Sequence, residues 1–484
     1  MRKGIKKGLA LGIALTMTGA CLTGCGKSNT GDTAATSAGD SAKEETTAAS
    51  DDTPSQADTT AAAEENALYS DLGGMSIVIG DWWTSADAAE PTTDQEEATL
   101  EYRNEIQQKY NFTISQQSIG AWSDIQETFT LSTMANDPAA QVCLMDQSFL
   151  AKPIANGLFY DLSTLSALDF TQSKWNQNDI SEMTIGGKTY GMASGKSEPR
   201  GGIFWNKRMF EDAGLDADLP YDLQASGDWD WDHFTDICKT LTRDTDNDGV
   251  TDVYATASFS NNMFPQLVAA NGAEYIGIDD TGKFYNASNT PEFLEAMNYG
   301  VSLISAGYEM PQPEGSDWDW FIAAFHDGNV AMTFSQEYMV GTWADMTDDW
   351  GFVMTPKGPE GDYVTVFSDN IAVIPSCYDA ETANKIAFAY DLYTNPTPGY
   401  EDDDDWKTSY YSVFRDERAV DETLNMMFEE GHGTTWVLPL VYGTGYGDID
   451  YDVYSLATTP EEKIETVGDT WSSLIDDANY SFSN

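Results

Sequence analysis

The chain has 484 residues, of which 41% are hydrophobic and 12% aromatic, so it can bury a large core that we expect to divide into two lobes. Its formal net charge of -56 argues against nucleic-acid partners, because the phosphates would be repelled. The three histidines show no metal-ligand spacing, which argues against a zinc site.

The N-terminal segment has the pattern of an export signal. A basic stretch at residues 2–7 precedes an apolar stretch at 8–20, which is too short to span a bilayer. The following residues, Leu22-Thr23-Gly24-Cys25, resemble the bacterial lipobox, in which the cysteine receives a diacylglycerol and cleavage occurs just before it. Two or more acyl chains give stable anchoring. We therefore predict a signal peptide at 1–24 and a lipid anchor on Cys25, the alternative being an ordinary secretory signal with an incidental cysteine.

Residues 25–68 are predicted to be a disordered linker. They consist almost entirely of Ser, Thr, Ala, Gly, Asp and Glu and show no apolar periodicity. A flexible chain of this length has an end-to-end distance of roughly 35 Å, enough to lift a domain clear of lipid headgroups.

From Met75 onward, short apolar strands alternate with helical periodicity, which indicates an α/β fold. Strands are predicted at 75–79, 112–116 and 141–145, with helices at 94–109 and 123–134 between them. Such a run lays its strands parallel, with their carboxyl ends at one edge of the sheet. Ligands of open α/β sheets bind in the crevice beyond that edge.

A second unit begins near Gly201, and the chain is expected to return to the first lobe at 364–375 before a largely helical C-terminal region. The further predicted strands are 202–206, 253–257 and 330–334, and the further helices are 230–242, 291–305, 317–326 and 379–394. The folded domain would span 69–484, with one lobe at about 70–197 and 364–396 and the other at about 200–360 and 397–484.

Five segments, in order along the chain, resemble those of the extracellular solute-binding proteins of bacterial ABC sugar importers (family 1), the group that includes maltose-binding protein. The most specific is 205–215, an aromatic-Asn-Lys followed by Phe-x-x-Ala-Gly-Leu. The others are the helix end at 132–138, the Gly-apolar-Asp-Leu turn at 156–162, the Gly-Lys-x-Tyr-Gly strand at 187–192 and the Phe-x-x-Gly-x-x-Ala-Met segment at 325–332. The acidic insert near 400–405 departs from the family pattern.

The resemblance implies a periplasmic-binding-protein-like fold of two lobes that close like a hinge over a solute. It implies a carbohydrate ligand, most simply an oligosaccharide, and delivery to the permease subunits of an ABC transporter, without catalysis. With the lipid anchor, it implies a monomer held at the extracellular face of a cell membrane and favours a Gram-positive cell, where no outer membrane would retain a free binding protein.

A carbohydrate site needs flat aromatic side chains for the C–H faces of the sugar and planar polar groups for its hydroxyls. Candidates follow predicted strands at their carboxyl ends or lie where the resemblance places contacts, although core packing is the default for any single tryptophan. The predicted ligand-binding residues are Asp81, Trp82, Trp83, Trp122, Asp146, Gln147, Glu198, Arg200, Asn261, Asn262, Glu337, Tyr338, Asp369, Asn370 and Trp436.

Residues 244–252 have the pattern of an EF-hand-like calcium loop. Carboxylates at Asp244, Asp246, Asp248 and Asp252 occupy positions one, three, five and nine, Gly249 occupies position six, and position seven, Val250, would offer its carbonyl. Position twelve is Ala255, where a glutamate is expected, so water or a distant carboxylate would complete the shell. We predict a structural Ca²⁺ ion; the alternative is an Asp-rich turn without metal.

Two other functions remain open. A protein of the same class could bind a solute other than a sugar. A surface glycoside hydrolase would need two carboxyl groups at a fixed separation, and among 80 acidic residues such a pair cannot be identified from sequence.

Overall fold

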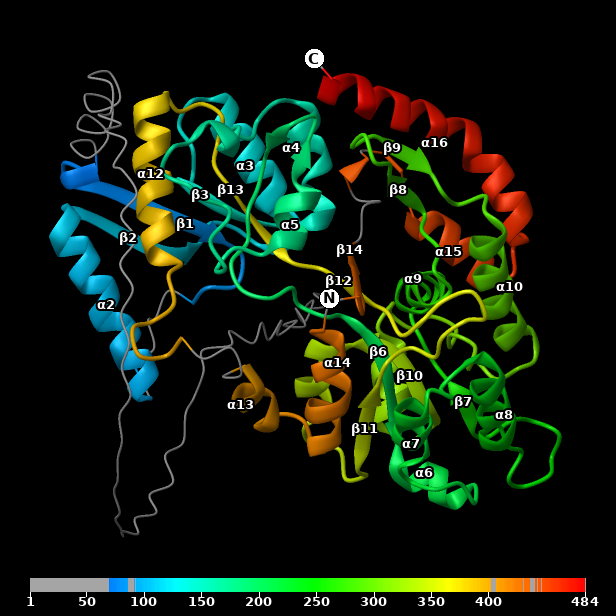
Figure 1. Ribbon diagram of the computed structural model, residues 1–484. Helices are drawn as coiled ribbons and strands as arrows, with labels where there is room; N and C mark the ends of the chain where they lie inside the picture. Colours follow the sequence, from blue (N-terminus) through cyan, green and yellow to red (C-terminus); the bar gives the residue numbers. More distant parts are fainter. Residues whose placement is uncertain are drawn as a thin grey trace, which may run out of the picture.

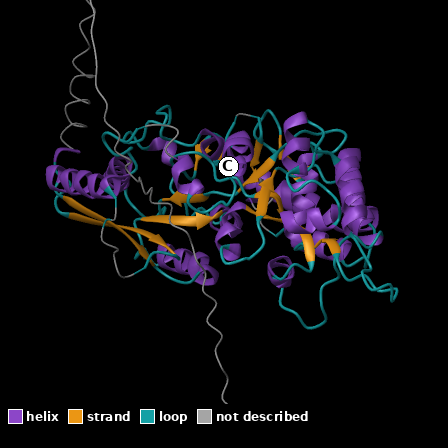
Figure 2. Ribbon diagram, turned by 90° about the horizontal axis from the view of Figure 1, so that it is seen from below, coloured by secondary structure: helices purple, strands orange, loops and turns teal. Residues whose placement is uncertain are grey.

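The computed structural model describes residues 69–85, 91, 93–401, 406–429, 431–435, 440–441, 443–444 and 446–483. The predicted signal peptide, Cys25, the linker up to residue 68 and Trp436 lie outside the described residues. Figure 1 shows two lobes, each built around a four-stranded sheet. Figure 2, viewed from below, shows the strands of the two sheets as two groups along the long dimension of the molecule.

The sheet of the first lobe has the strand order β13-β3-β1-β2. Its strands are β1 (Met75–Asp81), β2 (Phe112–Ser118), β3 (Val142–Asp146) and β13 (Asn370–Val373). β1 pairs in parallel with both β2 and β3, which confirms the predicted parallel run, and β13 adds an antiparallel edge. The carboxyl ends of β1, β2 and β3 therefore lie at one edge of the sheet.

Helices cover both faces of this sheet. α2 (Asp94–Tyr110) and α12 (Ala380–Tyr393) pack on one face, where Ile106 and Ile386 join the strand residues Ile77 and Ile114 in a common core. α3 (Ile125–Met134) and α4 (Ala151–Ala155) belong to the core on the other face, whereas α5 (Gln177–Glu182) packs Ile180 against the first core. α2 begins at Thr93 with a reciprocal capping box to Glu96, which satisfies two otherwise unpaired backbone N–H groups.

The sheet of the second lobe has the order β11-β6-β10-β7, and its central strand β6 is buried along its whole length. The strands are β6 (Gly201–Asn206), β7 (Tyr254–Thr256), β10 (Val330–Gln336) and β11 (Trp350–Val353). The helices around it are α6 (Lys207–Asp212), α7 (Leu219–Ser226), α8 (Trp231–Leu241), α9 (Ser260–Ala270), α10 (Pro291–Ser305) and α11 (Trp320–His326). The predicted strands and helices of this unit are confirmed to within a few residues at their ends.

Two extended segments cross between the lobes and pair with each other. Pro199 forms a bridge with Phe367, the N–H of Arg200 donates to the carbonyl of Val366 (3.0 Å), and the N–H of Ser368 donates to that of Glu198 (3.4 Å). We call residues 197–200 and 366–369 the crossing ribbon.

The predicted return to the first lobe at 364–375 is accurate only for its second half. β13 joins the first sheet, whereas β12 (Thr365–Phe367) pairs with β14 (Gly433–Thr435) and contacts β6 and α9 of the second lobe.

The described C-terminal region is mostly helical, as predicted. It comprises α13 (Trp406–Tyr411), a π-helical segment at Ala419–Leu424, α14 (Asn425–Met427), α15 (Tyr446–Tyr454) and α16 (Pro460–Ser483). α15 and α16 pack on α9 and α10, at the right of Figure 1. Two small hairpins, β4 (Thr184–Ile185) with β5 (Lys188–Thr189) and β8 (Ile276–Ile278) with β9 (Phe284–Asn286), complete the strands of the described residues. Among the described helices, none is both long and apolar enough to cross a bilayer.

Candidate functional site

A cavity of about 640 Å³ lies between the two lobes, beside the crossing ribbon. The first lobe contributes residues that follow the carboxyl ends of β2 and β3, which is where ligands of open α/β sheets bind. The second lobe contributes the first turns of α9, the segment before α11 and the end of β10. The predicted candidates on its lining are Trp122, Asp146, Gln147, Arg200, Asn261, Asn262 and Tyr338.

Each lobe presents an exposed indole to this cavity. Trp122, in the 3-10 turn Trp122–Asp124 before α3, is 50% exposed and packs on Phe149, with ring centroids 4.8 Å apart. Trp318, in the segment between α10 and α11, is 63% exposed and packs on Phe259 at 5.5 Å. Exposed tryptophans at a concave surface, held by a neighbouring ring, are well suited to cover the apolar face of a ligand.

Sequence reasoning identified Trp122 but missed Trp318 and Phe259. Trp318 lies between two acids, Asp317 and Asp319, at the start of the helix predicted at 317–326, whereas α11 begins only at Trp320. This polar setting was the available signal that Trp318 is not a core residue. Its near neighbour Trp320 is the buried one, since it begins α11.

Planar polar side chains fill much of the remaining lining. Asn261 and Asn262 lie in the first turn of α9, and Nε2 of Gln336 donates to Oδ1 of Asn262 at 3.5 Å. Gln266, which was not predicted, is held by two bonds, because its Nε2 donates to the Ser335 carbonyl (3.1 Å) and its Oε1 accepts from the Thr355 hydroxyl (2.8 Å). These amides suit paired hydroxyl groups.

On the first lobe, Asp146 and Gln147 line the cavity where β3 ends. Asp146 accepts hydrogen bonds from the backbone N–H (2.9 Å) and the hydroxyl (2.5 Å) of Ser148, which fixes the turn. Gln147 is buried, and its Nε2 donates to Oε2 of Glu182 at 3.3 Å.

Arg200 lies on the crossing ribbon at the floor of the cavity and is fully engaged. Its Nε and Nη2 donate to the Ser368 carbonyl (3.1 and 2.9 Å), and Nη2 also pairs with Glu198. Its guanidinium carbon lies 5.2 Å from the centre of the Tyr338 ring, a cation–π contact. The side chain is thus held in one position by four neighbours, the fourth being the buried acid Glu337.

Glu337 was predicted to contact ligand, but it lies beneath the cavity, 2% exposed, and does not line it. Its Oε2 is 3.6 Å from Nη1 of Arg200, and its Oε1 accepts from the Tyr410 hydroxyl at 3.3 Å. Burial raises the pKa of Glu337 to about 7, against the opposing effect of the Arg200 charge.

A second group of predicted residues lies outside this cavity. Trp83, Glu198, Asp369 and Asn370 line a separate cavity of about 380 Å³ between α2, α12 and the crossing ribbon. Trp82 packs edge-on against Trp83, with ring centroids 4.7 Å apart.

Asp81 is fully buried and organises the turn after β1. Its Oδ1 accepts from the N–H groups of Trp83 (3.1 Å) and Thr84 (2.9 Å), and its Oδ2 accepts from Gln116 (2.8 Å). The structure therefore divides the predicted set between a main cavity, a smaller neighbouring cavity and buried supports.

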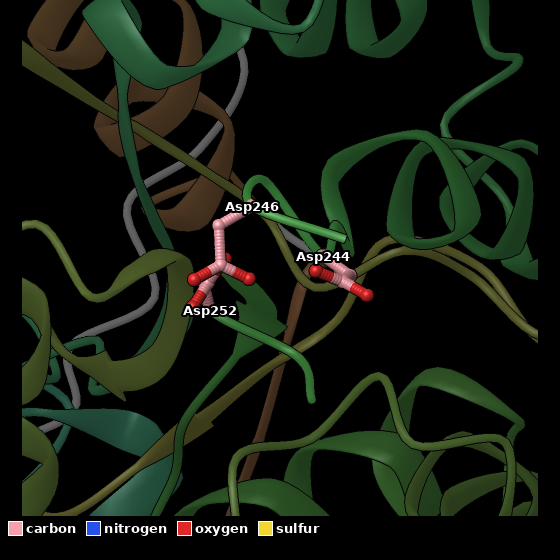
Figure 3. Close-up of side chains that lie close together, drawn as sticks. All are labelled: Asp244, Asp246 and Asp252. Atoms are coloured by element: carbon pink, nitrogen blue, oxygen red, sulfur yellow. The ribbon is translucent and has the colours of Figure 1, made fainter. Parts of the chain in front are cut away.

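Three carboxylates of the predicted calcium loop converge. Oxygen atoms of Asp244, Asp246 and Asp252 all lie within 4.8 Å of one another, and Figure 3 shows these side chains together. Gly249 adopts a φ of 90°, the left-handed conformation expected of the glycine at position six. Asp248 is not one of the three; its Oδ1 accepts from the N–H of Val250 at 2.8 Å. Ala255, at position twelve, is buried within β7 and offers no side-chain oxygen.

Comparisons with solved structures show the same fold in several binding proteins. An ABC substrate-binding protein from Listeria monocytogenes, in complex with cycloalternan, is 17% identical with a TM-score of 0.56, covering 84% of this chain and 99% of its own. A cyclic alpha-maltosyl-1,6-maltose binding protein from Arthrobacter globiformis is 17% identical with a TM-score of 0.58, covering 85% of this chain and 100% of its own. UgpB from Mycobacterium tuberculosis, in complex with glycerophosphocholine, is 16% identical with a TM-score of 0.57, covering 84% and 99%.

A comparison with curated protein sequences found no match. The family model described as "Bacterial extracellular solute-binding protein" matches residues 101–408, which is more than half of the chain and spans strands of both sheets. The chain belongs to the family of bacterial extracellular solute-binding proteins.

Proposed function

We propose that the solute is a carbohydrate, most simply an oligosaccharide, which binds without turnover between Trp122 and Trp318 and is delivered to the permease of an ABC importer. The observation that carries this proposal is the pair of exposed indoles, one from each lobe, on a cavity that is otherwise lined largely by amides and apolar groups. Closure of the lobes would bring both rings onto the apolar faces of a sugar.

The charges of the lining favour a neutral solute over an anionic one. Among the described residues of the main cavity, Arg200 is the one cation, and Glu198, Glu337 and the Ser368 carbonyl already engage it. A phosphate or carboxylate would find no free positive charge there, whereas sugar hydroxyls would find amides. The cycloalternan and maltosyl-maltose ligands named for two of the similar proteins support this choice, and the glycerophosphocholine of a third represents the alternative, a solute that is not a sugar.

A panel of oligosaccharides, including maltotetraose and cycloalternan, should contain members that raise the melting temperature, because a ligand that binds only the native state stabilises it. Chromatography after long incubation should recover the sugar unchanged. A thermal shift with phosphodiesters but not with sugars would favour the alternative solute. Hydrolysis products would contradict binding without turnover and favour the glycoside hydrolase.

Replacing either indole should weaken binding of a sugar found in that panel. Trp122→Ala and Trp318→Ala are each expected to lower the affinity about tenfold to hundredfold, since truncating a central aromatic contact costs roughly 1–3 kcal/mol. Titration calorimetry would measure the change. Tyr451→Ala, on the outer surface of α15 and similarly exposed, serves as the control and should bind like the parent protein. Unchanged affinity in both tryptophan variants would exclude the main cavity as the site.

We also propose that the loop at 244–252 binds a structural Ca²⁺ ion. Three convergent carboxylates and an exposed position suit a hard cation, and the Val250 carbonyl and water would complete its shell. The hydrogen bonds from Thr245 to Asp252 (2.7 and 2.5 Å), which lower the pKa of that carboxyl, keep it ionised as a ligand must be.

A chelator should lower the melting temperature of the calcium-loaded protein, because a site saturated at 100 times its Kd contributes about 2.7 kcal/mol. The chelator effect should disappear in Asp246→Asn. Asp279→Asn alters a comparable Asp turn that, among the described residues, belongs to no group of three convergent ligands, so this control should still respond to the chelator. An identical melting curve of the parent protein with calcium and with chelator would reject the metal.

The same proposal includes the lipid anchor on Cys25, which would keep the binding protein near its permease on the outer face of the membrane. The lipobox sequence and the extracellular family support it. Labelling with radioactive palmitate, with Cys25→Ala as the control, tests the anchor: an unlabelled parent protein would argue for release as a free secreted protein.

A further inference from the structure

Three buried carboxyl groups lie behind the floor of the main cavity. Asp179 and Glu182 belong to α5 of the first lobe, and Asp369 belongs to the crossing ribbon. The three residues are 1%, 5% and 5% exposed, respectively. A buried carboxylate is strongly disfavoured unless hydrogen-bond donors or cations surround it. The ionisation of these three groups therefore depends on the donors and cations that reach their oxygens.

Donors among the described residues are too few for three ionised groups. Oδ1 of Asp369 accepts from the N–H of Glu198 at 2.7 Å, the Ser197 hydroxyl is a further donor to Asp369, and Oε2 of Glu182 accepts from Gln147. Neither oxygen of Asp179, nor Oδ2 of Asp369, nor Oε1 of Glu182 is reached by a donor of the described chain. The carboxyl groups of Asp179 and Asp369 instead lie within hydrogen-bonding distance of each other. Two acids can make this contact only if a proton lies between them.

A metal ion is a weaker explanation for the unpaired oxygens. Within the described residues, the one group of three or more ligating atoms within 4.8 Å of one another is in the 244–252 loop, so α5 and the crossing ribbon do not form such a centre. The charge of Arg200 acts on Asp369, but this side chain is engaged by Glu198, Glu337 and Ser368. Lys196, which lines the smaller cavity with Asp369, lies over the rings of Trp406 and Phe428. β14, which packs against α5, contributes only Gly433–Thr435, which carry no charge.

The electrostatics of the pair agree with a retained proton. Burial raises the pKa of Asp179, and the neighbouring charges of Asp369 and Glu198 raise it further. Burial likewise raises the pKa of Asp369, while the N–H of Glu198, the hydroxyl of Ser197 and the charge of Arg200 oppose the shift. Burial also raises the pKa of Glu182, and the two aspartates add to that effect. These are all the charged groups that face the pair from α5 and the crossing ribbon.

The pair is connected to the lining of the cavity by short links. Asp369 holds the backbone N–H of Glu198 and directly follows Ser368, whose carbonyl accepts from Arg200. Arg200 and Ser368 both line the main cavity. The ribbon that carries these two residues is therefore tied to α5 of the first lobe through the Asp179–Asp369 contact.

We propose that Asp179 and Asp369 share one proton, and that this hydrogen-bonded carboxyl pair positions the crossing ribbon, and with it Arg200 and Ser368, at the floor of the cavity. The two aspartates are positioning residues for the solute site. Their role in solute binding rests on the proposed function, but the proton site and its hold on the ribbon do not.

Loss of the proton should loosen the ribbon. Each aspartate has a pKa in the folded protein above that in the unfolded chain, so its stabilising contribution is complete below the unfolded value and is lost as pH rises through the folded value. At a pH above the folded-state pKa values, both aspartates are ionised and the two adjacent carboxylates repel each other. The population of molecules in which the crossing ribbon has separated from α5 should then grow by up to about tenfold per pH unit.

Hydrogen–deuterium exchange of the crossing ribbon in the full chain without solute tests the proposal. After correction for the intrinsic pH dependence of exchange, the peptide containing Glu198 and Arg200 should be protected at pH 6 and lose protection at pH 9.5. Asp179→Asn places an amide donor against Asp369 that does not titrate, so protection should persist at both pH values. Asp369→Asn places the amide donor on the crossing ribbon, against Asp179. Protection should again persist at both pH values, so this variant can be used if Asp179→Asn folds poorly.

Asp450→Asn is the matched control, because Asp450 is equally buried, with a pKa raised by burial, but bonds to Tyr275 in the second lobe. In the Asp450→Asn variant, protection of the crossing ribbon should change with pH as it does in the parent protein. Equal loss of ribbon protection at pH 9.5 in the parent and both amide variants would overturn the proposal, as would full protection of the parent at that pH. If protection of the ribbon in the parent protein depended on calcium or sodium, the result would overturn the shared proton and indicate that a bound cation holds the two carboxylates together. None of these readouts uses a sugar, so a failure of carbohydrate binding would be distinguishable.

Discussion

The crossing ribbon is the constraint on which the rest of the structure depends. Two segments far apart in sequence, 197–200 and 366–369, pair through backbone hydrogen bonds and connect two lobes that otherwise have separate sheets. The same few residues supply the floor of the main cavity, through Arg200 and Ser368, and one wall of the smaller cavity, through Glu198 and Asp369. The crossing ribbon therefore determines both how the two lobes are connected and where the residues at the floor of the main cavity lie.

The charge of the chain makes this arrangement demanding. With 80 acidic and 24 basic residues, most carboxylates must remain in solvent. Those that are buried near the ribbon need a cation, hydrogen-bond donors or a bound proton to offset the cost of burial. Arg200 pairs with both Glu198 and Glu337, while Asp179 and Asp369 are proposed to share a proton. Engaging the one cation of the described lining in this way leaves the main cavity without a free positive charge, which is consistent with a neutral ligand.

Much of the fold could be predicted from the sequence because local periodicity determines it. The alternating strands and helices between Met75 and Met145 follow from apolar spacing, and Thr93 and Asp230 mark the starts of α2 and α8 by their capping side chains. The crossing at 364–375 was predicted only in part, since the switch from β12 to β13 within a few residues depends on pairing with β14, about 70 residues away. Apolar pattern alone carries no information on such a partner.

The site was less predictable than the fold. Residues that follow the parallel strands, such as Trp122 and Asp146, could be placed at the sheet edge from topology, but whether a side chain faces the cavity depends on local turns. Asp81 is withdrawn into a turn that it caps itself, and Glu337 is turned beneath Arg200. Trp318 was missed because the helix predicted at 317–326 included it, whereas α11 begins only at Trp320 and leaves its ring exposed to the cavity.

The most direct test of the account is a crystal structure of the protein with the oligosaccharide that gives the largest thermal shift. The account predicts density for the sugar between the lobes, with its rings against Trp122 and Trp318 and its hydroxyls near Gln266 and Asn262. Sugar bound in the smaller cavity beside Trp83, or on the outer surface of either lobe, would contradict it.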